Sequence, residues 1–239
     1  MRLLLGIALV LVVPLAGPTP SAQAAQAALA DGVVSVASGV LYDDCRDHPY
    51  SYSFTLPAGT DSWSIDVEAV GPDGTTEVSD IASGSGSIST GTGGLQFCGS
   101  EAAGSYELRA TVDHVDHDDV VADGAMAATA AFSMRKPYSR TSLAVSDRSP
   151  RFNQVVVFVM KARDERPYGY FATRYATMRL EVKVRGTWQR IRGSQTVSDS
   201  RGRARIAYRW DLRRSIRLRA VTKASSGYTG STSSPVRVG

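Results

Sequence analysis

The chain has 239 residues, 43% of them hydrophobic, and a formal net charge of only +4. It contains no G-x-S-x-G, no CxxC pair and no glycine loop followed by lysine, so the common signatures of serine hydrolases, zinc sites and P-loop proteins are missing. We therefore expect a protein that is not an enzyme and needs no cofactor.

The N-terminus has the features of a secretory signal peptide. Arg2 precedes an apolar run from Leu3 to Ala16, and the small residues that follow end in Ala22-Gln23-Ala24. The run is shorter than the roughly 20 residues of a membrane-spanning helix. We predict a signal peptide over residues 1–24 and a secreted protein, extracellular or associated with the cell wall. An uncleaved N-terminal anchor is the alternative, and no later segment is apolar enough to span a membrane.

The two cysteines, Cys45 and Cys98, both lie in the first half of the predicted mature chain. Disulfides persist in the compartments that secreted proteins reach, so we predict that these two residues pair. The closed loop would stabilise the fold by about 4 kcal/mol in the chain-entropy model. Two buried free thiols are the alternative.

The distribution of charge divides the mature chain into two domains. Residues 25–136 contain 17 acidic and four basic residues, a net charge of −13, whereas residues 137–239 contain six acidic and 22 basic residues, a net charge of +16. The boundary falls at Arg135-Lys136-Pro137-Tyr138, where a proline interrupts the strand pattern. Because the connector is short, we expect the domains to touch.

Apolar residues in the acidic domain recur with a period of two, which predicts β-strands. The tract from Ser83 to Gly94 is rich in glycine and serine and is interpreted as a flexible loop. The predicted strands cover residues 50–56, 63–69, 106–112 and 126–134.

The basic domain has a clearer alternation, with apolar residues on one side of each strand and arginines on the other. Asp199-Ser200-Arg201-Gly202 indicates a tight turn between two strands. Together the two halves predict an all-β fold of two antiparallel β-sandwich (immunoglobulin-like) domains after the signal peptide. The strands predicted in the basic domain cover residues 155–160, 178–185, 203–210 and 216–220.

Five stretches of the C-terminal half have a familiar pattern: residues 141–146, 180–188, 199–203, 218–228 and 230–233. They resemble the immunoglobulin-like β-sandwich modules that occur, often in tandem, in secreted proteins of actinobacteria. The resemblance implies a fold, not a function. In the N-terminal half, Gly104–Leu108 looks like a late strand of the same kind of sandwich. The chain departs from the pattern at Arg163–Tyr175, a long basic and aromatic segment where such modules have a short turn.

The segment from His114 to Asp119 is the strongest candidate for a metal site. Imidazole and carboxylate groups suit Zn²⁺, and the candidate ligands are His114, Asp116 and His117. A solvated hairpin loop is the alternative interpretation. Asp73, Glu77 and Asp80 could form a calcium loop, but they lack the spacing of an EF-hand, and we favour their interpretation as turn residues.

The 19 arginines and three lysines of the basic domain favour an anionic partner, because guanidinium groups form bidentate contacts with phosphate and carboxylate. Outside the cell such partners would be phosphate-bearing wall polymers, acidic polysaccharides or stray DNA, and we expect no sequence-specific binding of nucleic acid. Alternatively, the acidic domain neutralises these charges, or they serve solubility. The candidate binding residues are Arg166, Tyr168, Tyr170, Arg174, Arg179, Arg203, Arg205, Arg209, Arg217 and Arg219.

The leading hypothesis is thus a non-enzymatic secreted module that binds anionic envelope or extracellular polymers through its basic domain. A second hypothesis is an adhesion or protein-interaction subunit that self-associates through its oppositely charged domains. A third is a metal-binding or hydrolytic module centred on His114–Asp119.

Overall fold

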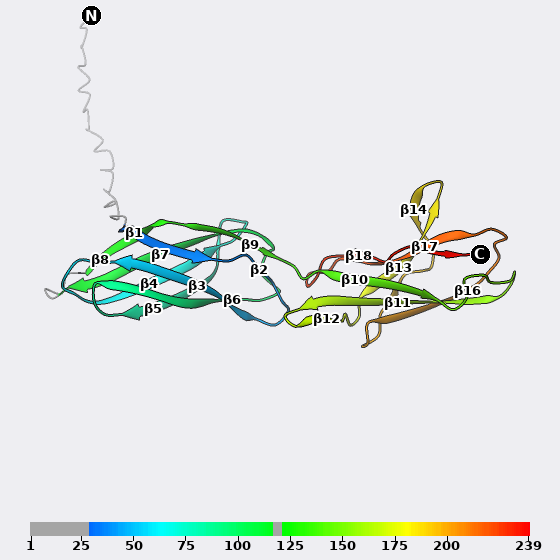
Figure 1. Ribbon diagram of the computed structural model, residues 1–239, viewed down its shortest axis with the longest axis horizontal. Coiled ribbons are helices and arrows are strands. Elements are labelled where there is room, and N and C mark those ends of the chain that lie inside the picture. Colours follow the sequence, from blue (N-terminus) through cyan, green and yellow to red (C-terminus); the bar gives the residue numbers. More distant parts are fainter. Residues whose placement is uncertain (1–28, 117–120) are drawn as a thin grey trace, which may run out of the picture.

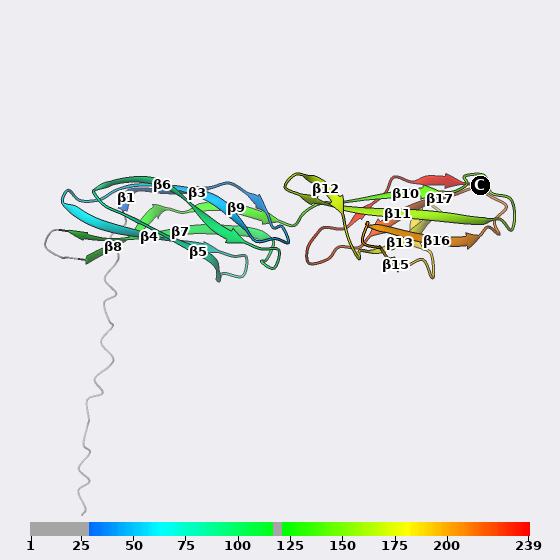
Figure 2. The ribbon, with the colours of Figure 1, turned by 90° about the horizontal axis from the view of Figure 1, so that it is seen from below.

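The computed structural model describes residues 29–116 and 121–239, and every regular element in those ranges is a β-strand (Figure 1). The strands form two β-sandwich domains that lie end to end, each with its own hydrophobic core (Figures 1 and 2). The predicted all-β fold of two sandwiches is confirmed. The predicted signal peptide lies outside the described residues, among which we find no helix of the length and hydrophobicity that would cross a membrane.

The first domain is a sandwich whose two layers join along one edge, because β8 pairs with β7 in one layer and with β1 in the other. Cross-strand pairing is mostly antiparallel, but β1 pairs with β8, and β2 with β9, in parallel. One layer contains β1 (Leu29–Val36), β3 (Arg46–Thr55) and β6 (Ile88–Phe97). The other contains β2 (Gly39–Val40), β4 (Thr60–Val70), β5 (Thr76–Gly84), β7 (Gly104–Asp116), β8 (Val121–Ala128) and β9 (Ala130–Arg135).

Side chains from both layers meet in the first core, as the alternation of apolar residues predicts. Tyr50 and Phe54 of β3 pack with Ile65 of β4 and Leu108 of β7, and all four are nearly fully buried. The segment predicted as one strand over residues 126–134 is divided at Thr129 between β8 and β9.

The predicted disulfide between Cys45 and Cys98 is present. Arg46 and Phe97 are the terminal pair of the β3–β6 ladder, so the disulfide lies directly beyond the end of that ladder. The covalent bond therefore ties together the ends of two neighbouring strands of one layer.

The interpretation of Ser83–Gly94 as a flexible loop is wrong. Most of the tract belongs to β5 and β6, and two glycines of β6 lie directly opposite tyrosines of β3, Gly91 opposite Tyr52 and Gly93 opposite Tyr50. A Cβ atom on either glycine would collide with the facing tyrosine ring. The glycines are therefore required by the space that the aromatic rings occupy, a device that stabilises strands containing glycine.

The second domain consists of two sheets in which all pairings are antiparallel. Phe158, Met160, Leu180 and Leu218 fill the space between the sheets. One sheet contains β10 (Ser139–Val145), β11 (Val155–Arg166), β12 (Gly169–Ala172) and β16 (Arg203–Arg209). The other contains β13 (Thr177–Val184), β14 (Thr187–Arg190), β15 (Thr196–Val197), β17 (Ile216–Thr222), β18 (Ser231–Thr232) and β19 (Val236–Val238).

A bidentate ion pair joins the two domains. Arg135, at the end of β9, donates two hydrogen bonds to Glu165 of β11, at 2.7 and 3.0 Å. Glu165 also accepts a bond from the Tyr138 amide at 3.0 Å, and the Arg135 guanidinium lies over the Tyr138 ring, 4.0 Å from its centroid. The hydrogen bonds from Arg135 lower the pKa of the Glu165 carboxyl, despite its partial burial. Tyr138 of the connector is thus held by Arg135 from the first domain and by Glu165 from the second.

Two further contacts fix the orientation of the domains. The Thr229 amide donates to the carbonyl oxygen of Pro137 in the connector, at 2.9 Å. Arg166 bridges the domains, since its guanidinium lies 2.6 Å from Asp164 in the second domain and 3.4 Å from Asp43 in the first. We call this set of contacts the interdomain joint.

The steric match between Gly93 and Tyr50 gives a first prediction. Gly93→Val is expected to lower the free energy of unfolding by about 1–3 kcal/mol, because the branched side chain must displace a buried ring. Thr92→Val, at an exposed position of the same strand, should change it by less than about 0.5 kcal/mol. Urea denaturation would measure both values, and equal stabilities would contradict this account of the glycines.

A second prediction concerns the joint. Glu165→Gln should widen the distribution of interdomain distances seen by small-angle X-ray scattering while leaving the stability of each domain within about 1 kcal/mol. Glu107→Gln, which removes an exposed ion pair with Arg109 inside the first domain, is the matched control. Because the folded pKa of Glu165 is lowered, the wild-type joint is intact above the ordinary glutamate pKa of about 4.3 and loosens as the pH falls through the lowered value. A scattering curve of Glu165→Gln identical to that of the wild type would refute the role of the pair.

Candidate anion-binding site

The outward face of the sheet formed by β10, β11, β12 and β16 carries a group of basic side chains. Met160 and Ala162 of β11 point into the core, so Lys161 and Arg163 point to solvent. The β11–β16 register places Arg203 directly beside Lys161. Because direct cross-strand neighbours have Cβ atoms about 4.5–5.5 Å apart, these cations form one continuous group.

A groove of about 220 Å³ lies among these side chains, and none of the residues that line it is acidic. We call it the basic groove. Its charged and aromatic lining residues are Lys161, Arg163, Arg201, Arg203, Tyr170 and Phe171.

The predicted tight turn before β16 brings two of these arginines to the groove. The Asp199 carboxylate accepts hydrogen bonds from the amides of Arg201 and Arg203, each at 2.8 Å, and these backbone bonds lower its pKa. Gly202 has a φ of 68°, and a Cβ atom there would lie 2.5 Å from the carbonyl oxygen of Ala162. Only glycine allows this approach, so the turn packs closely against β11.

Aromatic rings form one wall of the basic groove. Tyr170 of β12 is half-buried, with the guanidinium of Arg140 stacked 3.7 Å from its ring centroid. Phe171 beside it is 54% exposed. The groove therefore combines cations that form bidentate bonds to phosphate or carboxylate with rings on which a sugar could stack.

The ten predicted binding residues do not form one site. Arg203 and Tyr170 line the basic groove, and Arg205 and Arg209 continue along β16 as exposed residues of the same face. Tyr168, at the turn between β11 and β12, is 86% exposed, and Arg174 is exposed beyond β12. Arg166 belongs to the interdomain joint. The remaining three, Arg179, Arg217 and Arg219, lie on the other sheet.

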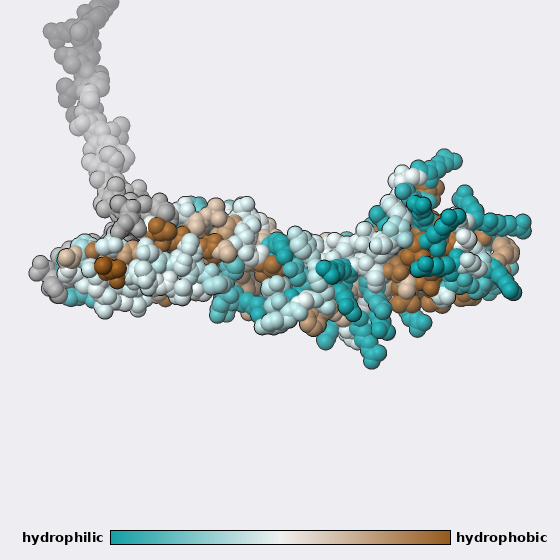
Figure 3. All heavy atoms as spheres, in the orientation of Figure 1, coloured by the Kyte–Doolittle hydropathy of each residue, from teal (hydrophilic) through white to brown (hydrophobic). Residues whose placement is uncertain are grey.

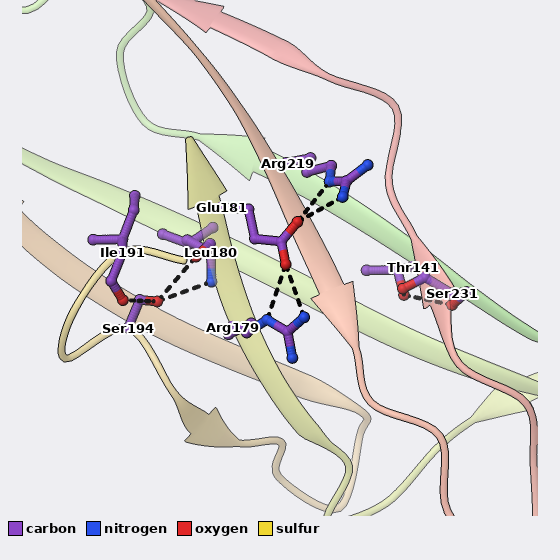
Figure 4. Close-up of polar contacts among 8 residues, drawn as sticks. All are labelled: Thr141, Arg179, Leu180, Glu181, Ile191, Ser194, Arg219 and Ser231. Atoms are coloured by element: carbon purple, nitrogen blue, oxygen red, sulfur yellow. Dashed lines mark hydrogen bonds and ion pairs between the residues drawn. The ribbon is translucent and has the colours of Figure 1, made fainter. Parts of the chain in front are cut away.

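Two of those arginines are neutralised within the second domain (Figure 4). Glu181, whose side chain is 8% exposed, accepts two hydrogen bonds from Arg179 at 2.8 and 3.0 Å and two from Arg219 at 2.7 and 2.8 Å. Burial raises the pKa of Glu181, but the bonds from the two arginines outweigh it and the pKa is lowered. Arg219 also lies 4.5 Å from the centroid of the Trp188 ring. These two arginines are structural and are less available to a ligand.

Hydroxyl groups fix the two sheets of the second domain against each other. The Thr141 hydroxyl of β10 lies 2.6 Å from the hydroxyl of Ser231, on β18 of the opposite sheet (Figure 4). It also lies 2.6 Å from the hydroxyl of Thr222, on β17 of that sheet. Ser194 is fully buried, and its hydroxyl lies 2.7 Å from the Ile191 carbonyl oxygen and 3.1 Å from the Leu180 amide. The scaffold that carries the basic groove is therefore rigid.

The candidate metal ligands are only partly described. His114 and Asp116 belong to β7 and lie on the side of the strand that faces the core, so the part of this segment before residue 117 is a strand and not a loop. His117 lies outside the described residues. Within the described ranges, no three His, Cys, Asp or Glu side chains are grouped to hold a metal ion.

Two of the residues considered for a calcium loop, Asp73 and Asp80, have structural roles. Asp73 accepts hydrogen bonds from the amide and hydroxyl of Thr75 in a turn, and these bonds lower its pKa. Asp80 accepts hydrogen bonds from the Tyr50 hydroxyl at 3.0 Å and from the Gly94 amide at 3.1 Å. Asp80 therefore helps to hold β5 against β3 and β6.

The candidate binding residues chosen from the sequence omit most of the basic groove. Lys161 and Arg163 continue the alternation of the buried run that starts at Val155, so extending the period of two along the strand would have identified them. Arg201 lies in the predicted turn. The convergence of β11, β12 and this turn is a tertiary feature that strand periodicity does not reveal.

No family model and no curated protein matches the sequence. Solved structures with a similar arrangement of strands include the red sea bream transglutaminase (TM-score 0.39, 7% identity, 90% of this chain and 32% of that one). A BSP domain of a biofilm associated protein also matches, with a TM-score of 0.26 and 14% identity over 86% of this chain and 29% of that one. Fibronectin(III)-like modules of Clostridium thermocellum CbhA match with a TM-score of 0.28 and 12% identity over 86% of this chain and 92% of that one. The chain spans about a third of the length of the first two. These TM-scores and identities are too low to bear on function.

The Glu181 cluster gives a third prediction. Glu181→Gln should lower the free energy of unfolding at neutral pH by about 1.5–3 kcal/mol, because two partly buried guanidinium groups lose charged hydrogen-bond partners. The folded pKa of Glu181 is lowered, so its contribution is present above the ordinary glutamate pKa and is lost as the pH falls through the lowered value. Denaturant unfolding at about pH 7 and about pH 3 should therefore show a difference between wild type and variant that shrinks in acid. A difference independent of pH would contradict the assignment.

Proposed function

We propose that this chain is a non-enzymatic extracellular binding protein that holds an anionic polymer in the basic groove of its second domain. The observation that carries the proposal is the convergence of Lys161, Arg163, Arg201 and Arg203 in a groove without a lining carboxylate. Guanidinium groups at a solvent-exposed site attract phosphate or carboxylate groups and bind them in bidentate fashion.

The exposed face around the groove supports a repeating ligand more than a single small anion. Arg205 and Arg209 extend the row of cations along β16, and Arg140 lies beside Arg163 on β10. A polymer with regularly spaced negative charges can contact several of these groups in turn, and each contact releases counterions. Tyr170 and Phe171 offer ring surface to a sugar of the same polymer.

Binding of the chain from residue 25 onward to long-chain polyphosphate and to polygalacturonate would test the proposal and would distinguish a phosphate ligand from a carboxylate one. We expect affinity to fall steeply with salt. The variant Lys161→Gln/Arg163→Gln/Arg203→Gln should weaken binding and lower the slope of log affinity against log salt by about 2–3, roughly one for each lost contact.

A charge-matched control separates the groove from overall charge. Arg148→Gln/Arg192→Gln/Lys223→Gln removes three exposed cations elsewhere in the second domain. We expect this variant to retain most of the wild-type affinity and slope. Equal losses in the two triple variants would show a diffuse charge effect and would refute the groove, and the absence of binding to both polymers at low salt would refute the proposal as a whole.

A further inference from the structure

Two cavities meet at the end of the second domain that lies away from the joint. One, of about 160 Å³, opens into the core between the sheets and is lined mainly by apolar side chains, among them Phe158, Trp210 and Leu218. The other is larger, about 830 Å³, and lies at the surface between the β13–β14 hairpin and the segment that connects β16 to β17. Leu212 and Ile216 line both cavities, so the two cavities adjoin at these side chains.

The surface cavity has a basic rim and an apolar floor. Lys183, Arg185, Arg214 and Arg217 line it, and all four are exposed. Val182 and Val184 add apolar surface to the contribution of Leu212 and Ile216. No Asp or Glu is among the residues that line the surface cavity, and Asp211 lines the inner one. Figure 3 shows apolar surface flanked by hydrophilic side chains in this part of the second domain.

The backbone of the β13–β14 hairpin holds one side of the rim in place. Arg185 and Gly186, the two residues between the strands, both have positive φ angles, 48° and 89°. A two-residue turn with positive φ at both positions matches the twist of a hairpin and is rigid. Lys183 lies beside Trp188 of β14, with its amino group 5.9 Å from the ring centroid.

From this arrangement we propose that the cavity pair binds a single-chain amphiphile with an anionic headgroup. The head contacts Arg214 and Arg217 at the rim, and the tail passes Leu212 and Ile216 into the apolar cavity. An apolar cavity of about 150 Å³ holds a group the size of benzene, so the inner cavity accommodates a short aliphatic segment. The ligand thus matches the site in both of its parts, charge outside and hydrocarbon inside.

This site is distinct from the basic groove. The groove lies on the outer face of the sheet that contains β11 and β16, whereas the rim is formed by β13, β14 and the start of β17 in the other sheet. No lining residue is shared. Occupation of one site therefore does not require occupation of the other, and each proposal is tested by its own variants.

Isothermal titration calorimetry with hexyl phosphate, butyl phosphate, inorganic phosphate and 1-hexanol would test the inference. Hexyl phosphate should bind more tightly than either of its parts, and each added methylene between butyl and hexyl should tighten binding by about three- to fourfold, as expected for hydrocarbon that leaves water. Hexyl sulfate in place of hexyl phosphate tests whether any anionic head suffices. The emission of Trp210, isolated as the difference between wild type and Trp210→Phe, should change as the tail enters.

Variants assign the two parts of the ligand to the two parts of the site. Arg214→Gln/Arg217→Gln, at exposed positions, should weaken hexyl phosphate binding at least about tenfold while leaving the dependence on chain length. Leu212→Trp should abolish that dependence by blocking the passage. The groove variant Lys161→Gln/Arg163→Gln/Arg203→Gln should bind hexyl phosphate as the wild type does. Affinity that does not rise with chain length, or that the Arg214/Arg217 variant leaves unchanged, would overturn the inference.

Discussion

The ion pair between Arg135 and Glu165 determines how two domains of opposite charge are arranged. Units carrying −13 and +16 attract each other, and a flexible connector would let the acidic domain lie against the arginine faces. The joint prevents this, because Glu165 binds both the end of the first domain and the amide of Tyr138 in the connector. The domains therefore meet end to end (Figure 1). The basic groove stays open to solvent.

The arginines of the second domain fall into two functional kinds. Arg166, Arg179 and Arg219 are held by carboxylates that are buried or nearly so, and they stabilise the joint and the sheet. The arginines on the outer face of β11 and β16 point to solvent. The acidic domain lies on the other side of the interdomain joint. Because charges separated by more than about 8 Å are largely screened at physiological salt, most of the negative charge of the first domain does not reach the groove. The net charge of the second domain does not show which arginines are paired with carboxylates and which are exposed to solvent.

Much of the fold follows from the period-two pattern, and the exceptions have physical causes. Alternation around Tyr50, Ile65 and Leu180 predicts the strands and the faces that they bury. It does not predict whether neighbours run parallel, as β1 and β8 do, because the period is the same in both cases. Gly91 and Gly93 appear flexible in the sequence, since the tyrosines that require them are about forty residues away along the chain. The period-two pattern does not predict the basic groove, because Lys161 and Arg201 become neighbours only through the turn at Gly202.

Through the disulfide, the redox state of the surroundings affects a contact between the two domains. Cys45 follows the short loop that carries Asp43, and a Cβ atom on Gly99, next to Cys98, would lie 3.0 Å from the Asp43 Cα atom. Oxidation of the two thiols therefore fixes the loop whose carboxylate reaches Arg166 in the other domain. In a reducing compartment the same loop is tethered only by non-covalent contacts. A covalent bond within the first domain thus supports the contact between Asp43 and Arg166, which is one of the contacts that hold the two domains together.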